Sequence, residues 1–224
     1  MEDNFIYFVN LDDFLVCANF ANTNRISTST VSHYIDHKEL HPVYTLSIED
    51  LKNSYVMNTY TSPRLQFLTK SNGSKKGLKL AIGLDNPIFL NENELKRIHE
   101  IADIEFEFER IRRLTNQYLP SRLVSIYLAE DNFEGRTMLK NMFIHKKDFI
   151  IVPINITTKA MFHKADSQWF DDYIQTKNPD SIKNYWNGID FNNIPLYEYL
   201  VDGAIELRNE DDRNVILKEY EKRF

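Results

Sequence analysis

Short runs of β-branched and aromatic residues predict strands along the chain. These runs lie at residues 5–9, 123–129, 148–156 and 196–207, the last as one strand or two. A proline within the run 148–156 indicates an edge strand or a bulge. Apolar residues at helical spacing predict helices at residues 11–20, 91–102, 104–118, 134–143, 166–173, 180–186 and 209–224.

Polar stretches divide these elements. Residues 22–32 and 68–77 are rich in Asn, Ser, Thr, Gly and Lys, which predicts loops, the second of them locally basic. Ser47 followed three residues later by Asp50 predicts a helix start. Strands and helices mix without a regular strand–helix–strand alternation, so we predict an α+β fold. The length of 224 residues suits one core. We therefore expect a single domain over residues 1–224, ending in a helical tail from 207 to 224.

Composition and charge exclude several functional classes. The net charge of −6 and the lack of a long basic tract weigh against a nucleic-acid scaffold. Cys17 is the single cysteine, which excludes an internal disulfide and a cysteine zinc site. The sequence has no glycine-rich dinucleotide or phosphate loop and no Gly-x-Ser-x-Gly turn. Its acidic start and the lack of a long apolar run predict a cytoplasmic protein that binds no membrane.

Two histidine patterns are candidates for ligand contact. His33, His37 and His41 recur every four residues, and on one continuous helix they would share a face as metal ligands do. The alternative is a solvated polar stretch, and we expect no metal site. In the turn His163-Lys-Ala-Asp166, the aspartate caps the next helix or His163 contacts a ligand.

Two predicted strands carry polar residues at positions that an ordinary core would fill with apolar ones. Ser125 and Tyr127 share one face of the strand at 123–129, while Arg122 falls by parity on the other. Such a polar face forms either a cleft or a satisfied core network. Glu198 stands within an apolar run, where a carboxylate is costly to bury unless it is paired or used. The alternative is an edge strand with Glu198 in water.

These two strands together resemble the ADP-ribosyltransferase superfamily, in the branch that includes the poly-ADP-ribose polymerases. The resemblance rests on Ser125-Ile-Tyr-Leu-Ala-Glu-Asp131 and Tyr197-Glu-Tyr-Leu-Val201, in the order tyrosine strand, helix, further strands, glutamate strand. Residues 107–207 also resemble a little-characterised bacterial and phage family of this fold. The shared motifs are Glu109-Arg-Ile-Arg112, Pro120-Ser-Arg122, His163-Lys-Ala-Asp166 and Tyr185-Trp-Asn-Gly188. The fold implied is a split mixed or antiparallel sheet with peripheral helices.

The resemblance implies an NAD-consuming enzyme. Glu198 would be the catalytic carboxylate, and Tyr127 would stack on nicotinamide. Arg122, Ser121 and Ser125 would line the NAD site, with Arg122 on the phosphates. The family's first strand carries a His or Arg that this chain lacks at residues 6–10, so Tyr7 and Asn10 are the candidates there. Arg25 or the loop Ser27-Thr-Ser-Thr30 is the alternative.

The acceptor implied is a macromolecule, either a nucleic acid (RNA or DNA) or a protein. Leu196 stands where arginine-modifying relatives carry Glu or Gln, so arginine is not the expected acceptor. A bacterial or phage toxin or defence effector with a neutralising antitoxin partner fits the family. The 71–76 loop and the arginines at 110, 112 and 113 either steer such a polyanion or form a solvated face. Glu198→Gln is expected to abolish activity with little change in stability. The alternatives are an inactive nucleotide- or protein-binding member of the fold, and an unrelated interaction protein.

Overall fold

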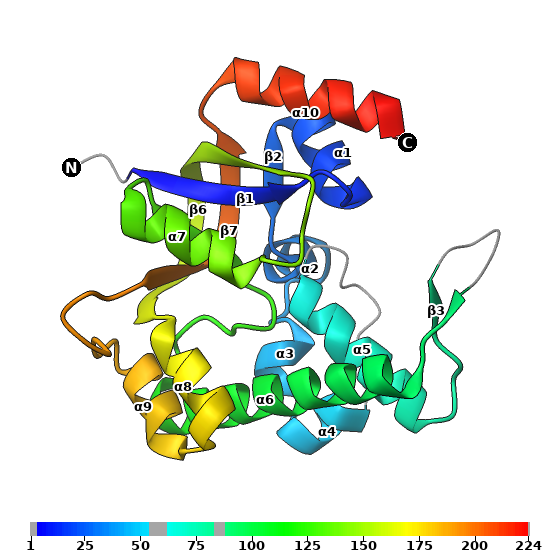
Figure 1. Ribbon diagram of the computed structural model, residues 1–224, viewed down its shortest axis with the longest axis vertical. Coiled ribbons are helices and arrows are strands. Elements are labelled where there is room, and N and C mark those ends of the chain that lie inside the picture. The colour runs from blue at the N-terminus through cyan, green and yellow to red at the C-terminus, as the bar shows by residue number, and fades with distance from the viewer. Residues whose placement is uncertain (1–3, 54–61, 83–87, 224) are drawn as a thin grey trace.

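The computed structural model describes residues 4–53, 62–82 and 88–223 (Figure 1). Its strands are β1 Phe5–Asn10, β2 Arg25–Ser27, β3 Ala81–Ile82, β4 Ile88–Phe89, β5 Ile126–Glu130, β6 Phe149–Asp166 and β7 Tyr197–Leu207. Its helices are α1 Phe14–Thr23, α2 Ser29–His37, α3 Pro42–Thr45, α4 Ile48–Asn53, α5 Pro63–Lys75, α6 Glu92–Asn116, α7 Phe133–Met142, α8 Gln168–Thr176, α9 Pro179–Trp186 and α10 Glu210–Arg223. The chain is therefore an α+β protein, as the sequence predicts.

The main sheet is antiparallel, and the glutamate strand lies inside it. Its strand order is β2-β7-β5-β1-β6, and β6 also pairs with β7, so four of the five strands close into a ring. β7 pairs with β6 along one side and with β5 and β2 along the other. Every strand pairing in this sheet is antiparallel. An edge position for β7, which would leave Glu198 in water, is thus wrong.

The two faces of β7 differ because side chains alternate along a strand. Tyr199, Val201 and Ile205 join the apolar core that contains residues of α1 and α10. Leu200, of the opposite parity, packs instead with residues of α6, α8 and α9. Figure 1 shows α1 and α10 together at one end of the molecule and α6 crossing at the other end with α8 and α9. Glu198 and Leu200, near the start of β7, therefore face this second group of helices.

Most predicted elements are confirmed, and several boundaries are corrected. Residues 22–32 contain β2 and the start of α2. Residues 68–75 of the loop predicted at 68–77 lie in α5, where Leu65 and Leu68 pack on α6. The helices predicted at 91–102 and 104–118 form one helix, α6, opened by a capping box at Asn91 and Glu94. The strand predicted at 148–156 continues to Asp166 because its second half pairs with β7.

Gly203 lies where β6 crosses β7 at a bulged register, opposite Lys159. A Cβ at Gly203 would overlap the carbonyl oxygen of Thr158. We expect Gly203→Ala to lower the free energy of unfolding by about 3 kcal/mol through this overpacking. Urea unfolding measures the change.

Gly77→Ala is the matched control. Gly77 has a φ of +86° and open space around its Cβ position, so alanine there meets only backbone strain, about 1 kcal/mol. Equal losses in the two variants would show that the close approach of β6 to Gly203 is not what limits that position.

Candidate functional site

The structure brings Tyr127 and Glu198 to one face of two paired strands. Tyr127 of β5 lies opposite Leu200 of β7, and Glu198 stands two residues from Leu200 on the same face. Both side chains are buried, with exposed fractions of 5% for Tyr127 and 1% for Glu198. A ligand as large as a dinucleotide does not reach either group in this conformation.

Arg122 connects the two residues. Its Nη1 atom donates to Glu198 Oε1 over 2.5 Å and to the Tyr185 hydroxyl over 2.6 Å. Its Cζ atom lies 5.4 Å from the centre of the Tyr127 ring. The Tyr127 hydroxyl in turn donates to the main-chain oxygen of Arg122, over 2.9 Å. One buried guanidinium therefore contacts both members of the predicted pair.

The parity expected for Arg122 is wrong. Residues 121–125 form a turn, in which the main-chain N–H groups of Val124 and Ser125 both donate to the carbonyl of Ser121. β5 begins only at Ile126. The alternation of a strand therefore does not apply to Arg122, and its side chain reaches the same face as Tyr127. Of the two readings of this polar face, the structure shows a satisfied core network.

Two residues from helices complete the network. Glu105 of α6 accepts from Arg122 Nε over 3.2 Å and from Arg64 Nε over 2.9 Å. The Arg64 guanidinium, from the first turn of α5, lies 3.5 Å from the Tyr127 ring centre. The result is a chain of alternating charges, Arg64–Glu105–Arg122–Glu198. Arg64, at one end, contacts the Tyr127 ring, and Glu198 is the other end. Two carboxylates against two guanidinium groups leave this chain of charges neutral.

Burial and pairing set the protonation states in this chain. Burial alone would raise the pKa of Glu105, but Arg122 and Arg64 together hold that pKa below its ordinary value. Burial would also lower the pKa of Arg122, but Glu105 and the other acidic groups around it, Glu198 among them, together outweigh burial, so this pKa rises. Burial raises the pKa of Tyr127 and of Tyr185. Glu105 and Arg122 are therefore charged at neutral pH, and both tyrosines carry their protons.

Tyr185 is a site residue that the sequence marks only as part of the motif Tyr185-Trp-Asn-Gly188. It is fully buried in α9, and its hydroxyl donates to Glu198 Oε1. His163 of β6 forms a 3.1 Å hydrogen bond with the carbonyl of Tyr185 and stacks on Trp186. Burial lowers the pKa of His163. The sequence signal for this residue is the aromatic pair Tyr185–Trp186 in α9. Sequence spacing does not show which of the two rings faces β7.

The remaining shared motifs serve packing. Glu109 accepts from Arg112, Arg113 and Ser121, each within 2.9 Å, and is 1% exposed. Ser125 is buried too, and its hydroxyl donates to the carbonyl of Ser121 over 2.7 Å. Arg112 is thus part of the core and is not a surface cation for a polyanion. Ser121 and Ser125 lie beside the Arg122 turn, fully hydrogen-bonded.

Tyr7 and Asn10 lie apart from the Tyr127–Glu198 pair. β1 is separated from β7 by β5, and the Tyr7 ring packs against Phe20 of α1, 6.0 Å between centres. Asn10 accepts from the main-chain N–H of Asp12 at the end of β1. The structure therefore does not bring these two predicted cofactor contacts to the pair.

The alternative segment, Ser27–Thr30, does reach β7. The hydroxyls of Thr28 and Thr30 donate to Asp202, which lies four residues after Glu198 on the same face. The Tyr44 hydroxyl donates to the other oxygen of Asp202 over 2.6 Å. Arg25 instead pairs with Glu206 at the surface. β7 thus presents two buried carboxylates to the helices, Glu198 held by an arginine and Asp202 held by hydroxyls.

The three histidines cluster, although one helix does not carry them. α2 ends after His37, and His41 caps α3 through Nδ1, which accepts from the main-chain N–H of Val43. The ring centres of His33 and His37 lie 4.6 Å apart, and those of His33 and His41 lie 5.4 Å apart. Across residues 4–53, 62–82 and 88–223, no group of three or more His, Cys, Asp or Glu side chains is arranged to hold a metal ion.

His41 is expected to make the free energy of unfolding depend on pH. Burial, and next the neighbouring His33, lower its pKa from 6.5 to about 4. The unfolded chain therefore binds a proton that the folded chain does not, so this part of the stability is present above the unfolded pKa and is lost as the pH falls toward 4. Between about pH 7.5 and about pH 5 we expect a loss of about 2 kcal/mol from His41.

The variant His41→Asn isolates this effect, because asparagine is a good helix cap that does not titrate. Urea unfolding of both proteins at the two pH values measures the difference. Equal pH dependence in the two proteins would show that His41 is not the responsible group.

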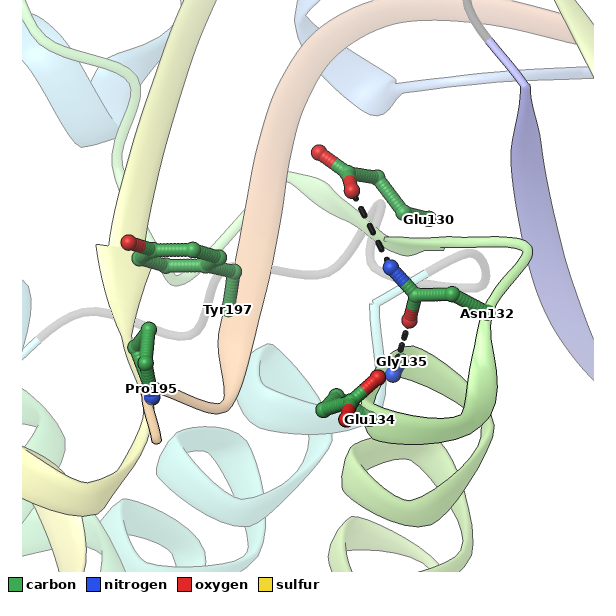
Figure 2. Close-up of a pocket in the computed structure, with 6 residues that line it drawn as sticks. All are labelled: Glu130, Asn132, Glu134, Gly135, Pro195 and Tyr197. Carbon is green, nitrogen blue, oxygen red and sulfur yellow. Dashed lines mark hydrogen bonds between the residues drawn. The ribbon is translucent and has the colours of Figure 1, made fainter. Parts of the chain in front are cut away.

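A small hollow lies on the other side of β7 (Figure 2). Its lining residues are Glu130, Asn132, Glu134, Gly135, Pro195 and Tyr197. Asn132 caps α7 there, accepting from Gly135 and donating to Glu130. The volume of about 20 Å³ holds about one water molecule. Tyr197 points away from the face that carries Glu198, so this hollow is not part of the Tyr127–Glu198 site.

The fold and the site define an α+β protein with a buried layer of ion-paired side chains between its sheet and its helices. The chain belongs to the family described as "Protein of unknown function (DUF2441)", whose model matches residues 21–213. The match contains the Ser27–Thr30 segment, Tyr127 and Glu198, and it begins after β1. No curated protein matches the chain. None of the helices in the described ranges has the length and apolar character that a membrane span requires.

Proposed function

We propose that the chain is an NAD-dependent ADP-ribosyltransferase, and that its closed antiparallel sheet is the split sheet of that superfamily. One observation carries the proposal. Tyr127 and Glu198, the two residues that the sequence resemblance singles out, lie on one face of paired strands and contact the same guanidinium. Residues that are 71 positions apart in sequence have no such relation unless the fold brings their strands together.

The residue types fit the chemistry of glycosidic transfer. The bond between nicotinamide and C1′ of the ribose breaks, and nicotinamide leaves with the electron pair of that bond. Positive charge develops on the ribose, and the Glu198 carboxylate, accepting from the ribose 2′-hydroxyl, stabilises it. The Tyr127 ring orients the leaving nicotinamide by stacking. The acceptor nucleophile forms the new bond to C1′ and loses its proton, and water takes this role when no acceptor is present.

Arg122 and Tyr185 act on Glu198 rather than on the substrate. Both donate to Oε1 of the carboxylate. This fixes one oxygen and leaves the other, Oε2, as the acceptor for a ribose hydroxyl. We propose that they are positioning residues. The acceptor class is a macromolecule, either a nucleic-acid base or a protein side chain other than arginine, as expected for a toxin or defence effector with an antitoxin partner.

Labelled NAD tests the proposal. The protein is incubated with NAD labelled in the adenosine half and with total cell lysate, and free nicotinamide is measured. Separate digestion with protease, DNase and RNase identifies the fraction that carries the label. We expect nicotinamide release together with label in one of these fractions. If no lysate gives either free nicotinamide or a labelled fraction, the proposal is contradicted.

The burial of the pair favours one other candidate, an inactive member of the same fold. Tyr127 and Glu198 are almost fully enclosed, and a network of this kind also serves as a core that specifies one packing. This candidate predicts no release of nicotinamide, so the same assay separates the two.

A further inference from the structure

Arg64 covers the ring on which nicotinamide would stack. Its Cζ atom lies 3.5 Å from the centre of the Tyr127 ring, the separation of two planar groups in van der Waals contact. The guanidinium is planar and cationic, as is the nicotinamide ring of oxidised NAD. Arg64 therefore makes the same kind of stacking contact with the Tyr127 ring that the nicotinamide ring would make.

We infer that Arg64 competes with the nicotinamide ring for the face of the Tyr127 ring. The conformation with Arg64 over Tyr127 is then a self-inhibited form, in which NAD must displace Arg64. The inference rests on the proposed function, since it takes Tyr127 as the nicotinamide platform. It goes beyond that function by assigning a regulatory contact to a residue of α5, a helix that contributes no catalytic group.

The contacts of Arg64 make it the member of the charged chain that leaves most easily. Its side chain is 14% exposed, whereas that of Arg122 is 2% exposed. When Arg64 moves away, Glu105 keeps its ion pair with Arg122. Displacing Arg122 instead would strip the buried Glu198 of its cation, which costs far more. Opening at α5 therefore leaves no buried carboxylate without a cation.

The tethering of α5 limits how far this opening extends. Ser62, which caps α5, donates to the carbonyl of Leu123 in the turn before β5. Leu65 and Leu68 of α5 are buried with Phe106 of α6. These contacts belong to other residues of the helix, so the Arg64 side chain leaves the Tyr127 ring without breaking any of them. The helix does not have to leave α6.

The test compares NAD affinity and turnover in three proteins: the wild type, Arg64→Ala, and the control Arg110→Ala. Arg110 is an exposed arginine of α6 paired with Glu107, outside the charged chain. Titration calorimetry gives the Kd for NAD, and nicotinamide release without an acceptor gives KM. We expect Arg64→Ala to lower Kd and KM by about 5- to 30-fold, the factor that corresponds to the loss of one competing cation–π contact. Arg110→Ala leaves both unchanged.

Arg64→Lys provides a second variant if alanine at this position prevents folding. A lysine keeps a positive charge near Glu105 but does not cover the ring as a plane, so a smaller gain in the same direction is expected. If the wild type releases nicotinamide and neither Arg64 variant binds NAD more tightly, the inference is overturned and the proposed function stands. If no protein binds NAD or releases nicotinamide, both fail.

Discussion

Glu198→Gln is expected to slow the release of nicotinamide from NAD by about a hundredfold or more, because an amide does not offset the charge that develops on the ribose. The same change is expected to lower the free energy of unfolding by about 3 kcal/mol, since Arg122 loses one of its two carboxylate partners inside the core. The sequence alone predicts little change in stability, and the burial of Glu198 changes that expectation. Initial rates and urea unfolding measure the two effects.

Glu109→Gln is the control that separates them. Glu109 is as deeply buried as Glu198 and is also paired with arginines, but it lies in the network that joins α6 to the Ser121 turn. We expect a similar loss of stability in this variant with nicotinamide release retained below its melting temperature. An equal loss of activity in both variants would trace the effect of Glu198→Gln to folding instead of chemistry.

Arg122→Met is expected to have the largest effect on stability. The variant leaves the Glu198 carboxylate, 1% exposed, without a cation, while Glu105 keeps Arg64. Removing one partner of a buried ion pair costs about 3 to 5 kcal/mol. Chemical unfolding at neutral pH measures the loss.

Arg110→Met provides the comparison for Arg122→Met, because it removes an arginine from an exposed pair with Glu107. Such pairs contribute about 0.2 to 1 kcal/mol, so its effect should stay within that range. A loss in Arg122→Met no larger than in Arg110→Met would contradict the account of Arg122 as the centre of the layer.

The sequence predicts the parts of this fold that depend on local pattern. The strands that contain Tyr7, Tyr127 and Glu198, the cap at Ser47 and the helix at 134–143 all follow from alternation, helical spacing and cap residues. β2 does not, because a three-residue strand carries too little pattern, and only its pairing with β7 makes it a strand. The middle of β6, residues 157–160, is exposed, and it is extended because β7 lies beside it.

The candidate site likewise contains residues that the sequence predicts and residues that only the fold reveals. The residue types and their order in the chain mark Tyr127 and Glu198, and the alternation on their strands correctly gives them a common face once β5 and β7 are known to pair. Arg122 was assigned to the wrong face because a turn at 121–125 interrupts the alternation. Arg64, Glu105 and Tyr185 come from helices whose packing against the sheet depends on the whole fold. No spacing along the chain relates them to Glu198.

A crystal structure of Glu198→Gln with NAD tests the central claim most directly, since this variant holds the substrate without rapid turnover. The account predicts the nicotinamide ring within about 4 Å of the Tyr127 ring, in the place of the Arg64 guanidinium. It also predicts the ribose 2′-hydroxyl within about 3 Å of the side chain at position 198. NAD bound elsewhere on the molecule, or no bound NAD with Arg64 still over Tyr127, would contradict it.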